Sequence, residues 1–443
     1  MIQITDKYNC CGCSACANAC PKACITMQSD REGFLYPHVD AATCINCGLC
    51  EKVCPVLNQN ETRRPNRVFA AINKDDQVRL KSSSGGIFTL LAEKVITQGG
   101  VVFGAKFDKN WQVVITPAET LNQITAFRGS KYLQARVDDS YMQCRQYLEA
   151  GRVVLYTGTP CQIAGLHRFL RRQYDNLVTV DFICHGVPSP GVWKRYLDEV
   201  LGAGKKAIQD VNFRNKSNGW KRFSFAIDYR EGNDTVSLVS PLDKNPYMQV
   251  FLNDIILRPS CYNCPAKASK SHSDITIADF WGIQNVLPSM DDDKGTSLCL
   301  VNSEKGENLI PYEKIRHESA TMDALRYNAA YNHSAKPNPK RDDFFMAFEK
   351  NEEDLHRIIA HSLRLTPKQK VKRLLRYPVV EARKLVKMLI CKSPKNTTGG
   401  GILYNDEMFN YPSSTFQTSS ISFRDKRQGW RHYVLRIDLK KIK

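Results

Sequence analysis

The feature that most constrains this 443-residue chain is a cysteine pattern that occurs twice near its N-terminus. In each copy the spacing is C-x2-C-x2-C-x3-C, and a proline follows the fourth cysteine directly. The copies are Cys10, Cys13, Cys16 and Cys20 with Pro21, and Cys44, Cys47, Cys50 and Cys54 with Pro55. Thiols this dense admit three interpretations, which are disulfides, a zinc site or iron–sulfur clusters.

The expected cellular compartment and the spacing of the cysteines distinguish these three interpretations. The N-terminus has no apolar run typical of a signal peptide, and no stretch of 18 apolar residues occurs, which predicts a cytoplasmic protein. Thiols stay reduced there, and a chain of this length needs no crosslinks to fold. Zinc usually takes two separated pairs of ligands, whereas the doubled pattern is typical of ferredoxins with two clusters.

We therefore predict a bacterial-type ferredoxin domain over residues 1–58 that holds two 4Fe–4S clusters. In such domains the fourth cysteine of each copy crosses to the other cluster. Cluster one takes Cys10, Cys13, Cys16 and Cys54, and cluster two takes Cys44, Cys47, Cys50 and Cys20. The leftover thiols Cys11 and Cys24 are expected to be packed rather than to bind metal.

After a polar segment at 59–67, interpreted as a linker, two polar loops stand out. The first, 82–86, is a Ser/Gly turn before a predicted helix that runs from Ile87 to about Thr97. A helix N-terminus of this kind can bind a phosphate, but serine is also a common cap for stability alone. The second loop, "RGSKYLQ", holds Arg128, Ser130 and Lys131, and by itself suits a solvated turn.

From residue 151 apolar strands alternate with helices, which predicts an α/β fold with its sites at the strand ends. Cys161 and Cys184 follow two such strands, and Cys261 and Cys264 share a C-x2-C turn. The spacing alone leaves open a third iron–sulfur cluster, a four-thiolate zinc site or unconnected thiols. Isolated thiols are expected to be buried and inert. These are Cys144, Cys299 and Cys391.

Six ordered segments resemble the family of coenzyme F420 hydrogenase/dehydrogenase beta subunits. They are "KSSSGGIFT", "RGSKYLQ", "GTPCQIAGL", "FICHGVPSP", "RPSCYNCPAK" and "SDITIADFWG". The resemblance covers roughly residues 68–290, and the ferredoxin domain matches members that carry one in front. It implies an α/β (α+β) body, with parts at 68–148 and 149–320, that holds FAD beside a 4Fe–4S cluster. Known substrates of the family include a deazaflavin coenzyme and a chlorophyll derivative.

The resemblance also implies site residues. The third cluster would be bound by Cys161, Cys184, Cys261 and Cys264. The flavin would be held by Ser83, Ser84, Gly85, Gly86, Ser130 and Lys131. Lys131 could then lie at the flavin N1 edge, where a cation stabilises the reduced anion. Asp279, Phe280 and Trp281 belong to a motif near the cofactor, and the resemblance does not fix their roles.

Together, these expectations predict that the chain is an oxidoreductase. A flavin exchanges one electron at a time with clusters and two with an organic substrate, which is unknown here. The ferredoxin domain would serve a one-electron donor or acceptor protein such as ferredoxin. His185 is a candidate proton donor, or it only holds its own loop. The alternative function is an electron-transfer module that serves a separate enzyme and has no substrate site of its own.

The C-terminal extension, residues 321–443, carries most of the net charge of +18. Residues 361–443 hold 19 Lys and Arg against 5 Asp and Glu. A basic amphipathic helix is predicted over 365–391, interrupted at Pro378, and it suits either an anionic membrane surface or packing on the protein. No nucleic-acid module accompanies the charge, so no nucleic-acid partner is expected. Residues 423–437 also resemble 213–227, for which the sequence offers no functional account.

Overall fold

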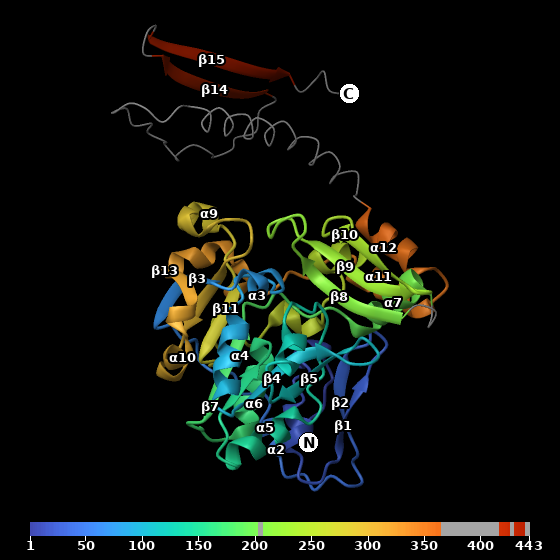
Figure 1. Cartoon of the computed structure of the whole chain (residues 1–443). Helices are drawn as coiled ribbons and strands as arrows, with labels where there is room; N and C mark the ends of the chain where they lie inside the picture. Colours follow the sequence, from blue (N-terminus) through green and yellow to red (C-terminus); the bar gives the residue numbers. More distant parts are fainter. Residues whose placement is uncertain (203–206, 365–415, 426–428, 439–443) are drawn as a thin grey trace. The chain divides into compact units, whose positions relative to one another are not determined.

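The structure is a computed structural model that describes residues 1–202, 207–364, 416–425 and 429–438, the last two segments as backbone alone. Residues Met1–Arg364 form one compact unit, and Leu365–Lys443 form a second (Figure 1). The predicted helix over 365–391 and Cys391 lie outside the described residues. No helix in the part that the structure describes is long and apolar enough to cross a bilayer.

An eight-stranded mixed sheet forms the centre of the first unit, in the order β13-β3-β12-β11-β7-β6-β4-β5. Its strands are β3 (Arg67–Asn73), β4 (Val101–Phe107), β5 (Val113–Ala118), β6 (Val154–Thr157), β7 (Leu177–Phe182), β11 (Ile275–Asp279), β12 (Ser297–Val301) and β13 (Ile315–Ser319). Strands β4, β6, β7 and β11 are parallel, and the outer strands run antiparallel. The carboxyl ends of the parallel strands therefore meet at one edge, as the alternating sequence predicted.

Helices cover both faces of this sheet, because its central strands are apolar on both sides. Val102 and Leu155 pack in the same core as α4, whereas Val101 and Val154 pack with α5 and α6. The helices are α4 (Ile87–Thr97), α5 (Ser140–Glu149), α6 (Pro160–Leu170) and α10 (Glu304–Leu309). The helix predicted from Ile87 to about Thr97 is confirmed, and it begins at the left-handed Gly86.

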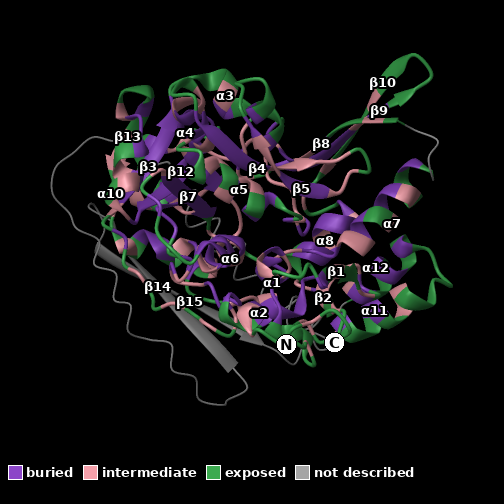
Figure 2. Cartoon of the chain, turned by 90° about the horizontal axis from the view of Figure 1, so that it is seen from below, coloured by how far each residue is buried: buried purple, intermediate pink, exposed green. Residues whose placement is uncertain are grey.

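A second, antiparallel sheet of three strands packs on helices of its own. The strands are β8 (Ala207–Asn215), β9 (Ser224–Glu231) and β10 (Asp234–Pro241), and the helices are α7 (Pro190–Leu201), α8 (Pro246–Leu252), α11 (Arg341–Lys350) and α12 (Leu355–Leu363). An aromatic core of Trp193, Phe213, Phe225 and Tyr247 joins them. The β9–β10 end projects into solvent, as the exposed colour in Figure 2 shows.

The N-terminal segment forms a small cysteine-rich module. Its elements are η1 (Lys7–Asn9), α1 (Ala15–Ala19), β1 (Ile25–Ser29), β2 (Leu35–Val39) and α2 (Leu49–Lys52). The module shares the unit of the body, because α1 packs on α5 and α6 and η1 packs on η3 (Pro259–Asn263). Residues 59–66 of the predicted linker are irregular, whereas Arg67 already begins β3, and Asn60 bonds to Arg168 and Lys270 of the body.

The β1–β2 turn makes a close backbone contact between module and body. Gly33 has a φ of +88°, and a Cβ added there would lie 2.6 Å from the Cα of Gly191 in the first turn of α7. Glu32 beside it forms a buried ion pair with Arg341, with one contact of 3.0 Å. Ser189, the cap of α7, donates to the backbone oxygen of Glu32.

The remaining short elements connect these parts. They are α3 (Asp76–Leu80), η2 (Gln123–Phe127), α9 (Ile283–Val286), η4 (Pro288–Met290), η5 (Tyr312–Lys314), η6 (Met322–Tyr327) and η7 (Ala329–Tyr331). In the second unit, β14 (Phe416–Asp425) pairs with β15 (Gly429–Asp438). The two similar sequences pair differently, because Gly429 and Trp430 begin β15 whereas Gly219 and Trp220 lie between β8 and β9.

Candidate functional site

The module contains a small cavity that is rich in sulfur. It is lined by Cys20, Cys44, Cys47 and Cys50, the four thiols predicted to bind cluster two, together with Cys24. Gly48 adopts a φ of +71° at the start of α2, which turns the chain around this space. The backbone N–H of Ile2 donates to the Cys50 sulfur at 3.4 Å, a contact that favours a thiolate.

The four thiols predicted for cluster one also lie together. Burial, followed by the charges of Cys10 and Cys54, raises the pKa of Cys16 to about 12. Cys54 belongs to the second sequence copy, so the structure places a cysteine of that copy near Cys16. Cys50 also acts on Cys16, which places the two groups of thiols side by side.

The cysteine sulfurs of the module are not arranged around a single metal ion. Among the described residues, no three His, Cys, Asp or Glu side chains converge as ligands of one metal ion do. Instead, the sulfurs of Cys20, Cys44, Cys47 and Cys50 line one cavity, and four cysteine thiolates are the ligand set of a 4Fe–4S cluster. The residues present therefore fit iron–sulfur clusters.

A third group of thiols lies at the carboxyl edge of the sheet. Cys161 lies in the first turn of α6 after β6, and Cys184 follows β7. Because β6 and β7 are parallel, both thiols reach the same edge. Burial raises the pKa of Cys184 well above its usual range, and the charges of Cys261, Cys161 and Cys264 contribute to this rise.

Cys11 connects the module with this third group. Its thiol interacts with Cys13, which is predicted for cluster one, and with Cys161 of the body. Cys11 is 8% exposed, so the contact is shielded from solvent. The sequence predicted a packed thiol here, and the structure adds that it lies between two groups of candidate ligands.

The two polar loops that the family resemblance assigned to the flavin meet in space. The Ser83 hydroxyl lies 2.8 Å from that of Ser130 and also accepts the backbone N–H of Ser130. The ammonium of Lys131 donates to the backbone oxygens of Arg128 and Gly129 at 3.1 and 3.3 Å. Burial lowers the pKa of Lys131 to about 8.

Contacts within the protein itself require the glycines of the first loop. A Cβ on Gly85 would lie 2.7 Å from the backbone nitrogen of Ser297 and would also collide with the Ala71 oxygen. Gly86 has a φ of +83°, and a Cβ there would lie 3.1 Å from the Cβ of Asn73. Substituting either residue would therefore disturb the sheet, whether or not a ligand binds nearby.

The sequence analysis missed Arg214, Lys216 and Trp220, which join Asp279 and Trp281 in a cluster beside Ser84. Arg214 forms a two-pronged ion pair with Asp279 at 2.9 and 3.0 Å, and its buried Nε has no partner among the described residues. Lys216 donates to the Ser84 oxygen at 2.9 Å, and burial lowers its pKa to about 7. Trp220 stacks on Trp281 at 4.9 Å. The signal was the repeated "FRNKSNGW" segment, which contains three of these residues.

His185, the candidate proton donor, lies beside the third group of thiols. Its Nε2 contacts the Asp254 carboxylate at 2.5 Å, and its ring meets Phe251 edge-on at 5.6 Å. The residue is exposed and follows Cys184 directly. This geometry is compatible both with proton exchange and with a role in holding the loop.

A second missed feature is a buried carboxylate behind Cys184. Asp181 accepts hydrogen bonds from Ser271 and Thr276 at 2.5 and 2.6 Å, and burial raises its pKa to about 6. It lines a small cavity together with Cys184 and Lys267. The Lys267 ammonium donates to the Cys184 backbone oxygen at 2.5 Å.

Comparison with known families agrees with this geometry. Residues 151–323 match the model for the C terminus of the coenzyme F420 hydrogenase/dehydrogenase beta subunit, and residues 9–58 match the 4Fe-4S dicluster domain. Residues 151–323 are therefore similar to the C-terminal domain of these beta subunits. The module in front of the body is a 4Fe–4S dicluster domain, so the prediction of a two-cluster ferredoxin domain is confirmed.

Three similar proteins illustrate the range of the match. One subunit of the F420H2 dehydrogenase of Methanosarcina mazei is 24% identical over 192 residues, which are 41% of this chain and 54% of that protein. An uncharacterized ferredoxin of Methanocaldococcus jannaschii is 36% identical over 52 residues, which are 12% of this chain and 66% of that protein. This chain thus spans about half the length of the first relative and two thirds of the second.

The third is a solved chain of the F420-reducing [NiFe] hydrogenase complex from Methanosarcina barkeri. It has a TM-score of 0.43 and 18% identity, and the match covers 60% of this chain and 88% of that chain.

Proposed function

We propose that the chain is an iron–sulfur flavoprotein oxidoreductase that passes electrons between a one-electron protein and a two-electron substrate. The observation that carries this proposal is the segment from Ser130 to Gln134. At one end Ser130 contacts the serine turn, and at the other Gln134 accepts from Arg258, which itself contacts Cys10. One short segment therefore links the proposed flavin site with the cysteine module.

Twelve cysteines would hold three 4Fe–4S clusters in this proposal. The third cluster would be bound by Cys161, Cys184, Cys261 and Cys264, with the backbone N–H of Val187 donating to the Cys261 sulfur at 3.4 Å. The thiols of cluster one are buried, whereas Cys47 is exposed. The one-electron partner would therefore exchange electrons at cluster two.

Ser83, Ser84, Gly85, Gly86, Ser130 and Lys131 would hold FAD. When bound, FAD would exchange single electrons with clusters and electron pairs with an organic substrate. Several groups suit its phosphates and ring, including the N-terminus of α4, the unpartnered Nε of Arg214 and the ammonium of Lys131. Coenzyme F420, which gives the family its name, is the first two-electron substrate to test. His185 would exchange a proton.

Cofactor analysis of the full chain after anaerobic reconstitution tests the proposal. We expect about twelve irons and about one FAD per chain. The double variant Ser83→Ala, Ser130→Ala should retain less FAD with unchanged iron. Ser82→Ala is the matched control, because its hydroxyl bonds to Val78 within α3.

Two results would contradict the proposal. Stoichiometric zinc would exclude the clusters. Full iron without any bound flavin would instead support the alternative function, an electron-transfer module that serves a separate enzyme.

A further inference from the structure

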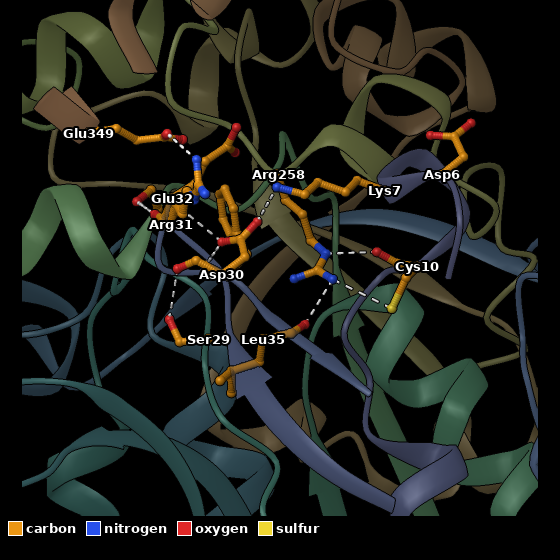
Figure 3. A network of polar contacts seen from close by, with 12 residues as sticks. Asp6, Lys7, Cys10, Ser29, Asp30, Arg31, Glu32, Leu35, Arg258 and Glu349 are labelled. Carbon is orange, nitrogen blue, oxygen red and sulfur yellow. Dashed lines mark hydrogen bonds and ion pairs between the residues drawn. The ribbon is translucent and has the colours of Figure 1, made fainter. Parts of the chain in front are cut away.

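Arg258 is a buried cation at the contact between the cysteine module and the body. Its side chain is fully buried, and its guanidinium fork donates to three oxygens. These are the backbone oxygens of Cys10 at 2.7 Å and Leu35 at 2.9 Å, and the Gln134 amide oxygen at 3.0 Å. A fourth contact of 3.5 Å joins Nη2 to the Cys10 sulfur (Figure 3).

No carboxylate among the described residues lies at ion-pair distance from this guanidinium. A buried charge normally requires a paired charge, because the loss of hydration costs several kcal/mol per ion. Burial by itself lowers the pKa of Arg258, but nearby groups raise it, Cys10 first and then Tyr36, Cys11 and Cys261. Among these groups, the Cys10 sulfur is in contact with the guanidinium, at 3.5 Å, and a thiolate there would balance its charge.

The position of Arg258 also relates it to two clusters. Cys10 is a proposed ligand of cluster one, and Cys261, three residues after Arg258, is a proposed ligand of the third cluster. The ring of Tyr36 lies under the guanidinium at 4.2 Å. The loop around Gly12 is close as well, because a Cβ there would lie 2.9 Å from Nη1. The cation is thus fixed in place from both sides.

We propose that Arg258 sets the reduction potential of cluster one by raising it. Reduction adds negative charge to a cluster, and a fixed cation bonded to one of its sulfurs stabilises that charge. Arg258 is a positioning residue in this role, since it acts through Cys10. The inference rests on the proposed function, because it requires the clusters to be present.

Arg341 provides a matched control. It is also buried, donates to the backbone oxygen of Leu257 and pairs with Glu32 at the same junction. Its charge is balanced by a carboxylate, and its hydrogen bonds and ion pairs with the described residues all go to oxygen rather than sulfur. Loss of Arg341 would therefore affect the junction without changing the electrostatics of cluster one.

The experiment uses the full chain, reconstituted anaerobically as wild type, Arg258→Gln, Arg258→Lys and Arg341→Lys. Iron and sulfide are counted first, and the clusters are then titrated with redox mediators while their EPR signals are recorded. In Arg258→Gln we expect one transition to move to more negative potential by at least about a tenfold change in its equilibrium constant, or about 59 mV for one electron. Arg258→Lys should move it less, because the charge remains, and Arg341→Lys should leave it unchanged.

Each other outcome has a definite meaning. Full iron with no shift in Arg258→Gln, or an equal shift in Arg341→Lys, would overturn the proposal. Loss of about four irons in both Arg258 variants would also overturn it, since Arg258 would then be a structural support. Absence of clusters from the wild type would reject the proposed function instead, so the two failures are distinguishable.

Discussion

The cavity in the cysteine module and the polar cluster in the body are assembled in opposite ways. All five sulfurs around the cavity come from two short stretches, 20–24 and 44–50. The polar cluster instead joins Ser83, Arg214, Asp279 and Trp220, which different loops and strands contribute. A site built from neighbours in sequence is specified by spacing, whereas a site built by tertiary contacts depends on the whole fold.

The largest expected effect is on the third group of thiols, which belongs to the second type of site. Replacing Cys161, Cys184, Cys261 or Cys264 by serine should remove about four irons per chain, because a hydroxyl is a poor ligand for iron in this state. Iron and sulfide counts on the four variants test this. Full wild-type iron in Cys161→Ser and Cys261→Ser would show that this third group of thiols is structural. The contrast between two kinds of metal site would then not hold.

The next effect concerns the junction at Glu32. Arg341→Met should leave a buried carboxylate without its partner, at a cost of about 3–5 kcal/mol in the free energy of unfolding. Anaerobic urea unfolding measures this cost. The double variant Glu32→Gln, Arg341→Met should recover part of it, and a double variant as unstable as Arg341→Met would contradict the unpaired-charge explanation.

The variant Arg214→Gln tests whether the polar cluster of the body binds the flavin. It removes the partner of Asp279 and the donor proposed to face FAD, so we expect at least about a tenfold loss of flavin affinity, or about 1.4 kcal/mol. Equilibrium dialysis measures the affinity. Lys194→Gln is the control, because that side chain is exposed and pairs only with Asp198 nearby. Equal affinity in wild type and Arg214→Gln would remove this cluster from the flavin site.

A smaller effect concerns pH. The pKa of Lys131 is lowered to about 8 by burial, so its ammonium is charged below that pH and becomes neutral above it. Affinity for an anionic flavin should therefore fall roughly threefold to tenfold between pH 7 and 9. Lys131→Arg should remove this dependence, because arginine stays charged. An identical pH profile in the variant would place Lys131 away from the ligand.

The smallest effect is expected at Cys24. Its sulfur lies 3.3 Å from that of Cys20 and lines the cavity, but it stands outside the doubled pattern. Cys24→Ser should keep the full iron count, in contrast to Cys47→Ser, which should lose about four irons. Iron loss in Cys24→Ser with full iron in Cys47→Ser would show that the cysteine spacing assigns the wrong ligand in the module.

The same contrast explains which features could be predicted from the sequence. The doubled cysteine pattern, the helix from Ile87 and the alternation of strands and helices after residue 151 depend on local spacing and periodicity. The contact between Arg258 and Cys10 joins positions 248 apart, and no local pattern encodes it. Gly85 was interpreted as a place for close approach of a ligand, but its own sheet already requires the glycine.

The backbone contact between Gly33 and Gly191 has an evolutionary consequence. Neither residue can gain a side chain unless the turn of the module or the first turn of α7 moves, because each Cβ would meet the backbone of the other segment. The two segments must therefore change together during divergence. A ferredoxin domain from another protein, fused in front of this body, would need a glycine at the same point of its β-hairpin. Only then could the hairpin pack against the first turn of α7 in the same way.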